Sequence, residues 1–168
     1  PVYKNELSLW KDTIKKNPDA WIAHSNLGIA LFAEQKNEEA ISHYKMAVEL
    51  NPDLALAHNN LGSALLNKGR TSEAISHFKM AIKLRPIHTK AHYNLGIALV
   101  AEQKKEEAIS HYKMAIKLNP NYTNAHYNLG YALLQKGEVK EAVHYFRETL
   151  KLRPDLVKAR DNLELALL

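Results

Sequence analysis

Cysteine is missing from all 168 residues of the sequence, which excludes disulfide bonds, thiolate nucleophiles and cysteine-ligated zinc sites. Long apolar runs are missing as well. None approaches the roughly 20 residues that span a bilayer, so we expect no membrane insertion by this segment. No signal peptide is visible, and the chain begins with Pro1 and not with Met, which indicates a processed form or a piece of a longer protein. The compartment, cytoplasmic or periplasmic, therefore stays open.

Glycine is scarce, with six residues, and runs of Val, Ile and Thr bounded by turn residues do not occur. The chain is therefore predicted to be helical throughout. Charge of one sign is not concentrated either: the net charge is +5, but Lys and Arg are mixed with Glu along most of the chain. A nucleic-acid interface needs basic residues gathered on one face, so we expect no nucleic-acid partner.

What the sequence does contain is a repeat of 34 residues. The recurring glycines are Gly28, Gly62, Gly96 and Gly130, and the recurring prolines are Pro18, Pro52, Pro86, Pro120 and Pro154. A fixed period with two amphipathic helical stretches per unit predicts a solenoid, in which each unit buries its apolar face on its neighbours. We expect ten helices in one array over residues 1–168. Its predicted parts are a partial repeat with only a second helix (1–20), four full repeats (21–54, 55–88, 89–122 and 123–156) and a partial repeat with only a first helix (157–168).

Small residues predict how the two helices of a unit pack. The repeated glycine lies in the middle of each first helix, where it costs about 1 kcal/mol relative to alanine; close approach of the second helix is expected to compensate. The predicted facing residues are Ala40, Ala74, Ala108 and Ala142. Asp53 and Asn121 are expected to cap the helices that follow them. Gly69 and Gly137 are expected to adopt the left-handed conformation after a helix end.

Each unit also repeats a pattern of residue types. Asn-Leu-Gly is followed by an alanine twelve residues after the glycine, an aromatic residue four positions later, a further small residue and the closing proline. The aromatic residues are Tyr44, Phe78, Tyr112 and Phe146. This pattern resembles the tetratricopeptide repeat, and it departs from that family at Thr149, where alanine is usual, and at the histidine before each Asn-Leu-Gly region, where an aromatic residue is common. The resemblance implies an all-α, right-handed solenoid of antiparallel helix pairs.

Two finer resemblances concern parts of the chain. The repeats look most similar to the superhelical tetratricopeptide region of O-linked N-acetylglucosamine transferases. The opening from Tyr3 to Trp10, together with Ala23 to Gly28, is similar to the tetratricopeptide tails of membrane glycosyltransferase-like proteins. Residues 21–54 and 89–122 are identical at 25 of 34 positions, which indicates duplication of a two-repeat block.

Seven of the nine histidines fall at two repeat positions, which invites a metal-site interpretation. They are His24, His58, His92 and His126 on first helices, and His43, His77 and His111 on second helices. Equivalent residues of stacked helices lie ~10 Å apart, whereas ligands approach an ion to about 2 Å. We therefore predict histidines packed between helices, with no metal and no cofactor. No facing carboxylate pair, nucleophile elbow or phosphate-binding loop occurs, so no catalytic residue is predicted and the chain is not expected to be an enzyme.

The family resemblance places the ligand on a concave face lined by the first helices. The predicted binding residues are one asparagine per unit, Asn26, Asn60, Asn94, Asn128 and Asn162, together with Asn59, Tyr93, Ile97, Tyr127, Tyr131 and Lys90. Ser25 and Gln135 are expected to be exposed on the same face. A side-chain amide offers two donors and an acceptor, so this asparagine ladder either holds an extended peptide backbone or fixes the packing of the helices. Both roles stay open.

The predicted function is that of a non-catalytic scaffold for a protein or an extended peptide. One alternative is an appendage that recruits substrate to a larger, membrane-bound glycosyltransferase. The other is a self-assembly module, a homo-oligomer formed through the terminal helices, with Trp10 at one end and Leu163 and Leu167 at the other. Tyr3, Leu7, Trp10 and Ile14 belong to the partial repeat at the first of these ends.

Overall fold

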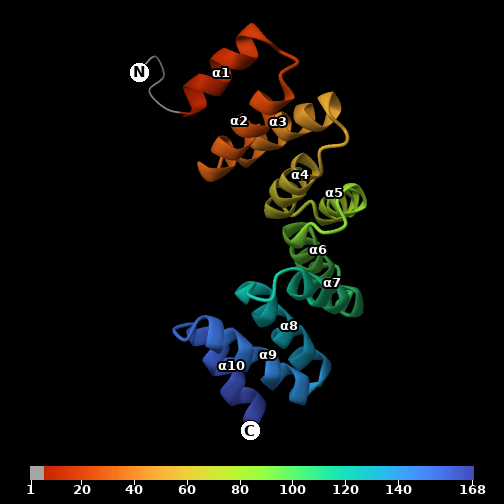
Figure 1. The fold of residues 1–168 in the computed structure, drawn as a ribbon, viewed down its shortest axis with the longest axis vertical. Coiled ribbons are helices and arrows are strands. Elements are labelled where there is room, and N and C mark those ends of the chain that lie inside the picture. Colours follow the sequence, from red (N-terminus) through yellow and green to blue (C-terminus); the bar gives the residue numbers. More distant parts are fainter. Residues whose placement is uncertain (1–5) are drawn as a thin grey trace. The chain divides into compact units, whose positions relative to one another are not determined.

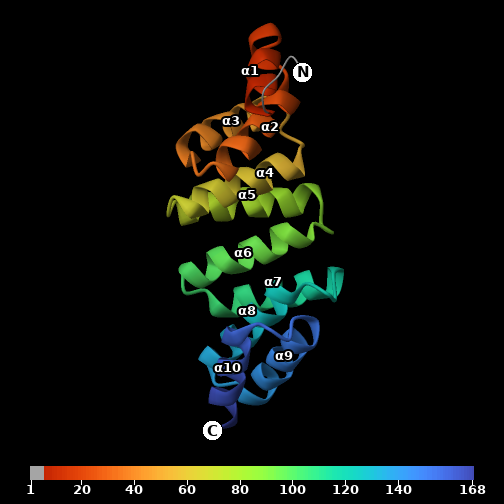
Figure 2. The same cartoon turned by 90° about the vertical axis from the view of Figure 1, so that its left-hand side faces the viewer.

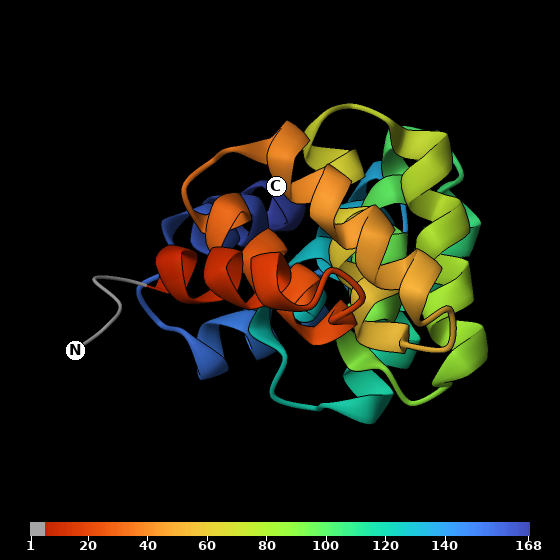
Figure 3. The same cartoon turned by 90° about the horizontal axis from the view of Figure 1, so that it is seen from above.

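A computed structural model describes residues 6–168 of the chain; Tyr3 lies outside the described residues. Within them the chain forms ten α-helices joined by turns, without a strand (Figure 1, Figure 2 and Figure 3). The all-α class and the ten helices agree with the prediction. The helices are α1 (Glu6–Lys16), α2 (Trp21–Ala33), α3 (Asn37–Leu50), α4 (Ala55–Asn67), α5 (Thr71–Leu84), α6 (Thr89–Ala101), α7 (Lys105–Leu118), α8 (Thr123–Lys136), α9 (Val139–Leu152) and α10 (Val157–Leu167).

The helices fall into two compact units, Pro1–Pro86 (unit 1) and Ile87–Leu168 (unit 2). In unit 1, α2 and α3 form one antiparallel pair and α4 and α5 form the next, while α3 also packs against α4 and α1 against α2. Unit 2 has the same order: α6 pairs with α7, α8 pairs with α9, and α7 packs against α8. The last helix, α10, packs on α9 and touches α8. Each helix therefore contacts elements close to it in the sequence, as expected for a repeat array.

The turn inside each helix pair needs one residue in the left-handed region. Gly69 and Gly137 take this role with φ of 75° and 85°, as predicted, because glycine has no Cβ to oppose a positive φ. In the other two pairs the same role falls to Gln35 and Gln103, both with φ of 61°. A residue with a side chain pays roughly 1–2 kcal/mol for that conformation.

The predicted capping by Asp53 and Asn121 is wrong. The N-cap residues of α4 and α8 are Leu54 and Tyr122, and neither makes a side-chain cap hydrogen bond. Asn121 instead belongs to the preceding turn, where its backbone N–H donates to Oδ1 of Asn119 at 3.1 Å. The polar side chain before the proline thus stabilises the turn between repeats, while the helix start relies on backbone hydrogen bonds.

The nearest neighbour of each repeated glycine is an aromatic ring and not the predicted alanine, although the backbone carbonyl oxygen of Ala142 lies 3.3 Å from a Cβ built on Gly130. A Cβ built on Gly28, Gly62 or Gly96 would lie 2.5–2.7 Å from the nearest ring carbon of the aromatic residue on the paired helix. On Gly130 it would lie 2.9 Å from Phe146. The contacting rings belong to Tyr44, Phe78, Tyr112 and Phe146. A flat ring lies against the bare backbone of the first helix, and this contact fills the space that a side chain would occupy. The four alanines are fully buried nearby.

Thr149, the departure from the usual alanine, is fully buried. Its hydroxyl donates a hydrogen bond to the carbonyl oxygen of Tyr145, one turn earlier in α9, at 2.8 Å. A buried hydroxyl costs free energy only when it lacks a partner. The bond to Tyr145 therefore makes threonine tolerable at a position that is otherwise apolar.

Candidate functional site

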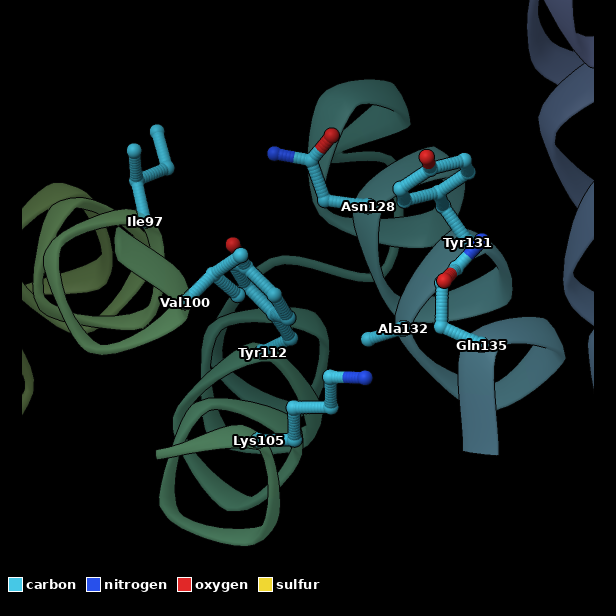
Figure 4. A pocket seen from close by; sticks show the side chains of 8 residues that line it. All are labelled: Ile97, Val100, Lys105, Tyr112, Asn128, Tyr131, Ala132 and Gln135. Atoms are coloured by element: carbon cyan, nitrogen blue, oxygen red, sulfur yellow. The ribbon is translucent and has the colours of Figure 1, made fainter. Parts of the chain in front are cut away.

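Unit 2 contains an apolar pocket of about 220 Å³ between α6, α7 and α8. Its lining residues are Ile97, Val100, Lys105, Tyr112, Asn128, Tyr131, Ala132 and Gln135. Figure 4 shows Ile97 and Val100 on one side, Tyr131 and Gln135 on the other, and Tyr112 between them. The aliphatic side chains and tyrosine rings form most of the walls, and Lys105, Asn128 and Gln135 add polar groups. This composition is typical of pockets that accept an apolar group and orient it with few polar contacts.

Tyr112 owes its position in the pocket to Gly96. The ring packs directly on the backbone of α6 at this glycine and is 2% exposed, while Figure 4 shows the hydroxyl directed toward the space between Ile97 and Asn128. Burial raises the pKa of Tyr112 well above its usual range, so the phenol is neutral at physiological pH and acts as a hydrogen-bonding group. The equivalent residues of the second and fourth repeats, Phe78 and Phe146, lack this hydroxyl.

Asn128 and Asn162 each donate a hydrogen bond to a tyrosine of the preceding repeat. Nδ2 of Asn128 donates to the Tyr93 hydroxyl at 3.2 Å, and Nδ2 of Asn162 donates to the Tyr127 hydroxyl at 3.1 Å. Burial raises the pKa of Tyr93, and the bond from Asn128 lowers it in part because it favours the phenolate. The amide N–H groups therefore help to join successive first helices, which is the packing role left open by the sequence.

A second aromatic contact holds Tyr93 in place. Its ring centroid lies 4.9 Å from that of Tyr122, and the planes are inclined by 56°. Burial raises the pKa of Tyr122 to about 12. Tilted rings at this separation attract each other through their quadrupoles. Tyr93, which accepts the hydrogen bond from Asn128 of the pocket, is thus held in place by Tyr122 and by Asn128.

The predicted site residues differ in exposure. Half-buried positions are Asn26, Asn60, Asn94, Asn128, Asn162, Tyr93, Ile97 and Tyr127. Tyr131 is 44% exposed and Lys90 is exposed as well. Asn26, Asn59 and Asn60 belong to unit 1, and the remaining predicted site residues to unit 2. Within unit 2 the pocket brings together Ile97, Asn128 and Tyr131 from the predicted binding residues, and Gln135, which was expected on the same face.

Two residues expected on the exposed face are buried. Ser25 is 5% exposed and Asn59 is 4% exposed, and Asn59 donates from Nδ2 to Oδ1 of Asn60 at 3.4 Å. Both occupy the repeat position that Tyr93 and Tyr127 hold in unit 2. A short side chain there stays below the surface, whereas a tyrosine is long enough to reach it. The expected exposure of Ser25 and Asn59 is therefore wrong.

Sequence reasoning missed four residues that line the pocket: Val100, Lys105, Tyr112 and Ala132. Lys105 and Tyr112 lie on α7, a second helix, whereas the predicted concave face consists of first helices. One signal was available, since Tyr and Phe alternate at the aromatic position of successive repeats. A hydroxyl at an otherwise apolar position needs a polar neighbour.

The described helices offer neither a metal centre nor a membrane span. Over residues 6–168, no group of three or more potential metal ligands converges. No helix in that range is both long enough and apolar enough to cross a membrane. The histidines of first and second helices do meet in pairs between the helices, as the packing interpretation predicted.

Comparison with known proteins agrees with this architecture. A family model described as TPR repeat matches residues 28–69 and 98–137, and one described as Tetratricopeptide repeat matches residues 55–88 and 123–156. A search of curated proteins gave no significant match.

Several solved structures share the fold. A crystal structure of MamA is 28% identical with a TM-score of 0.82, and the match covers 90% of this chain and 89% of that one. YrrB, described as a TPR protein with an unusual peptide-binding site, is 25% identical with a TM-score of 0.81, with coverage of 94% and 81%. PilF of Pseudomonas aeruginosa, at 20% identity and a TM-score of 0.77, covers 94% of this chain and 78% of its own and supports the fold alone. With its 34-residue period, its antiparallel helix pairs and these matches, the chain belongs to the tetratricopeptide repeat family.

Proposed function

We propose that the chain is a non-catalytic binding scaffold and that unit 2 holds an apolar side chain of an extended peptide in the pocket between α6, α7 and α8. The observation that carries this proposal is the pocket itself, whose apolar walls include Ile97, Val100 and Tyr131. Val100 and Tyr131 are 40% and 44% exposed, so apolar surface is left open to a partner. Covering it removes that surface from water, at roughly 25 cal/mol per Å².

The polar groups at the pocket suit a peptide backbone. Asn128 uses one N–H on Tyr93, which leaves its carbonyl oxygen as an acceptor for a peptide N–H. Gln135, two turns further along α8, adds a second amide to the lining of the pocket. Contacts of this kind bind main chain of any sequence, while the pocket selects the side chain that enters it. YrrB, a neighbour with a peptide-binding site, supports the same class of ligand.

The test begins with a peptide-display selection against the wild-type chain, followed by titration of the selected peptide. Tyr131→Ala and Val100→Ala remove partly exposed pocket walls and are expected to weaken binding about tenfold or more, since a large aromatic contact at an interface is often worth 2 kcal/mol. Met114→Ala is the matched control, because Met114 lies on α7, is 38% exposed and does not line the pocket. Equal losses for Tyr131→Ala and Met114→Ala, or no loss for either pocket variant, would remove the pocket from the mechanism.

The asparagine ladder is tested separately with the double variant Asn94→Ala/Asn128→Ala. Binding through these amides is expected to weaken, while helix content, measured by circular dichroism, stays that of the wild type. If affinity is unchanged, the ladder serves packing alone. The further binding positions Asn26, Asn60, Asn162, Tyr127 and Lys90 are proposed to extend the same contact along the first helices of their own units.

A second candidate is self-association through α10, which the exposure of its leucines favours. Leu165 and Leu167 are 61% and 59% exposed. Glu164 holds the position of the repeated glycine, and Trp10 holds that of the aromatic residue that packs on it. The side chain of Glu164 would block the ring of Trp10 from a second copy from packing on α10 as the aromatic residue of each complete repeat packs on its glycine. The exposed leucines of α10 would therefore have to form the interface. Light scattering over a concentration series tests this: a constant monomer mass excludes it, and growth that Leu165→Ser/Leu167→Ser abolishes supports it.

The glycosyltransferase hypothesis, including the resemblance to O-linked N-acetylglucosamine transferases, stays a prediction. The coding sequence on both sides of residues 1–168 tests it directly. An adjoining transferase domain would make this chain the recruiting part of an enzyme, and the pocket would then serve the enzyme's substrate.

A further inference from the structure

Each helix pair of unit 1 contains two histidines whose ring nitrogens face each other. Nδ1 of His24 lies 3.0 Å from Nδ1 of His43, and Nδ1 of His58 lies 3.0 Å from Nδ1 of His77. The ring centroids are 5.2 Å apart in both pairs. In each pair the first-helix histidine is only 6% exposed. These are hydrogen-bonded imidazole pairs between two helices, and the proposed binding site does not use them.

The positions of the ring hydrogens follow from the neighbours. Nε2 of His24 lies 3.0 Å from the carbonyl oxygen of Pro18, which has no hydrogen to give, so Nε2 is the donor. In a neutral ring Nδ1 then carries the lone pair. It therefore accepts a hydrogen bond from Nδ1–H of His43. The second pair repeats the arrangement through the oxygen of Pro52 at 3.0 Å.

This arrangement limits how many protons a pair can hold. A first proton on the outer Nε2 of His43 leaves the bond between the two Nδ1 atoms intact. A second proton would have to enter on Nδ1 of His24, which would set two N–H groups and two positive charges against each other across 3.0 Å. The native pair therefore holds one proton at most, whereas the unfolded chain binds two once the pH lies well below 6.5.

The surrounding charges do not change this balance for the first pair. Burial lowers the pKa of His43, the charge of His24 lowers it further, Glu39 on the same helix raises it and Lys11 from α1 lowers it. One carboxylate and one ammonium thus oppose each other around the ring. Their opposition leaves burial and the partner histidine as the main effects.

The second pair has the same kind of surroundings. Burial lowers the pKa of His77, followed by the charge of His58, while Glu73 on α5 raises it and Lys45 from α3 lowers it. In both pairs the folded state binds fewer protons than the unfolded state at mildly acidic pH. The contribution of the pairs to the free energy of unfolding is therefore fully present above about pH 6.5, the pKa of histidine in the unfolded chain, and falls as the pH drops below that value.

We propose that the two histidine pairs make the helix hairpins of unit 1 open at mildly acidic pH. Each proton that a native pair excludes raises the unfolding equilibrium constant by up to about tenfold per pH unit. Two pairs raise it by up to about a hundredfold per unit when the hairpins unfold together. The histidine pairs thus make the stability of each helix pair in unit 1 depend on pH, although the two helices otherwise pack through alanines, leucines and aromatic rings.

Unit 2 supplies a natural comparison. His92 and His111 form the same contact, with 3.0 Å between their Nδ1 atoms. In the following repeat Tyr145 replaces the second histidine: its ring centroid lies 5.9 Å from that of His126. Nδ1 of His126 is buried there without a hydrogen-bond partner. That repeat therefore contains a single buried histidine and no imidazole pair.

The experiment compares urea unfolding of the full chain between pH 7.5 and 5.0 for the wild type and for His24→Gln/His58→Gln, which leaves in each pair only the half-buried histidine that can take up its proton in the folded state. Carboxylates are common to both and cancel in the comparison. The wild type is expected to lose stability more steeply, by up to about a hundredfold per pH unit in the unfolding constant. His144→Gln, at an exposed histidine of α9 outside the pairs, is expected to follow the wild type. Equal pH dependence of the wild type and the double variant would overturn the proposal.

A measurement on the wild type alone covers the case in which the double variant does not fold. Nuclear magnetic resonance of the imidazole C–H groups follows each histidine during acidification. Each pair is expected to take up no more than one proton while the chain remains folded. Two complete titrations within one pair of the folded chain would overturn the proposal equally.

Discussion

Substituting Gly96 by alanine tests the contact on which both the repeat packing and the pocket depend. A Cβ at this position would lie 2.5, 2.7 and 3.0 Å from three ring carbons of Tyr112. Such separations are far below van der Waals contact, and the ring cannot simply swing away because it is 2% exposed. The helices or the ring must therefore shift, and the walls of the pocket shift with them.

The expected magnitude follows from two opposing effects. Overpacking a tight core costs about 1–3 kcal/mol, and a separation of only 2.5 Å from a buried ring carbon belongs at the upper end. Replacing a glycine inside a helix by alanine returns about 1 kcal/mol. Gly96→Ala is therefore expected to lower the free energy of unfolding by about 2 kcal/mol.

Gly130→Ala is the matched control, because it is the same substitution at the same repeat position with more room. Its Cβ would lie 2.9 Å from Phe146, so the overlap cost falls to about 1 kcal/mol and nearly cancels the gain in helix propensity. Urea unfolding followed by circular dichroism measures both. If Gly96→Ala stabilises the chain, or if the two variants lose the same free energy, the contact with Tyr112 does not determine the choice of glycine.

Two further predictions concern the turns and the tyrosines. Gln103→Gly removes a side chain from a residue with a positive φ of 61° and is expected to raise the free energy of unfolding by about 0.5–1 kcal/mol after the entropy cost of glycine. Gly137→Ala, at φ 85°, is expected to lower the free energy of unfolding by about 1 kcal/mol. Thermal unfolding that ranks the two variants in the opposite order contradicts the strain argument. Asn128→Ala removes the bond that lowers the pKa of Tyr93, so phenolate absorbance for this group should appear at higher pH than in the wild type. Because burial raises this pKa in the folded state, stability should fall as the pH rises above 10 in both proteins, and an unshifted phenolate titration would show that the bond is not made in solution.

The repeat architecture could be predicted from the sequence because it rests on local and periodic signals. The spacing of Gly28, Gly62, Gly96 and Gly130 determines the period, and the closing prolines end the second helices. Helices starting at Trp21, Ala55, Thr89 and Thr123 coincide with the predicted repeat starts. Each unit depends mainly on its own residues and its neighbours, so little long-range information was needed.

The site was predicted only in part, for a related reason. Ile97, Asn128 and Tyr131 were selected because they occupy outward positions of first helices, and the pocket includes them. Tyr112 belongs to the aromatic pattern of the repeat and its ring is buried in the core, yet its hydroxyl reaches the pocket (Figure 4). Periodicity identifies the face of a helix but not how far a side chain extends beyond its neighbours, as the buried Ser25 and Asn59 also demonstrate.

By itself, the sequence determined the helical class, the number of helices and the left-handed glycines, because each follows from residue type and spacing along one chain. Only the tertiary structure decided which side chain fills the space at each repeated glycine, that His24 meets His43 nitrogen to nitrogen, and where an apolar pocket opens in unit 2. Those features depend on differences of a few tenths of an ångström in the separations between side chains and backbones of different helices. A periodic pattern places such residues on facing surfaces, but the contact between them is determined by how closely the two backbones approach.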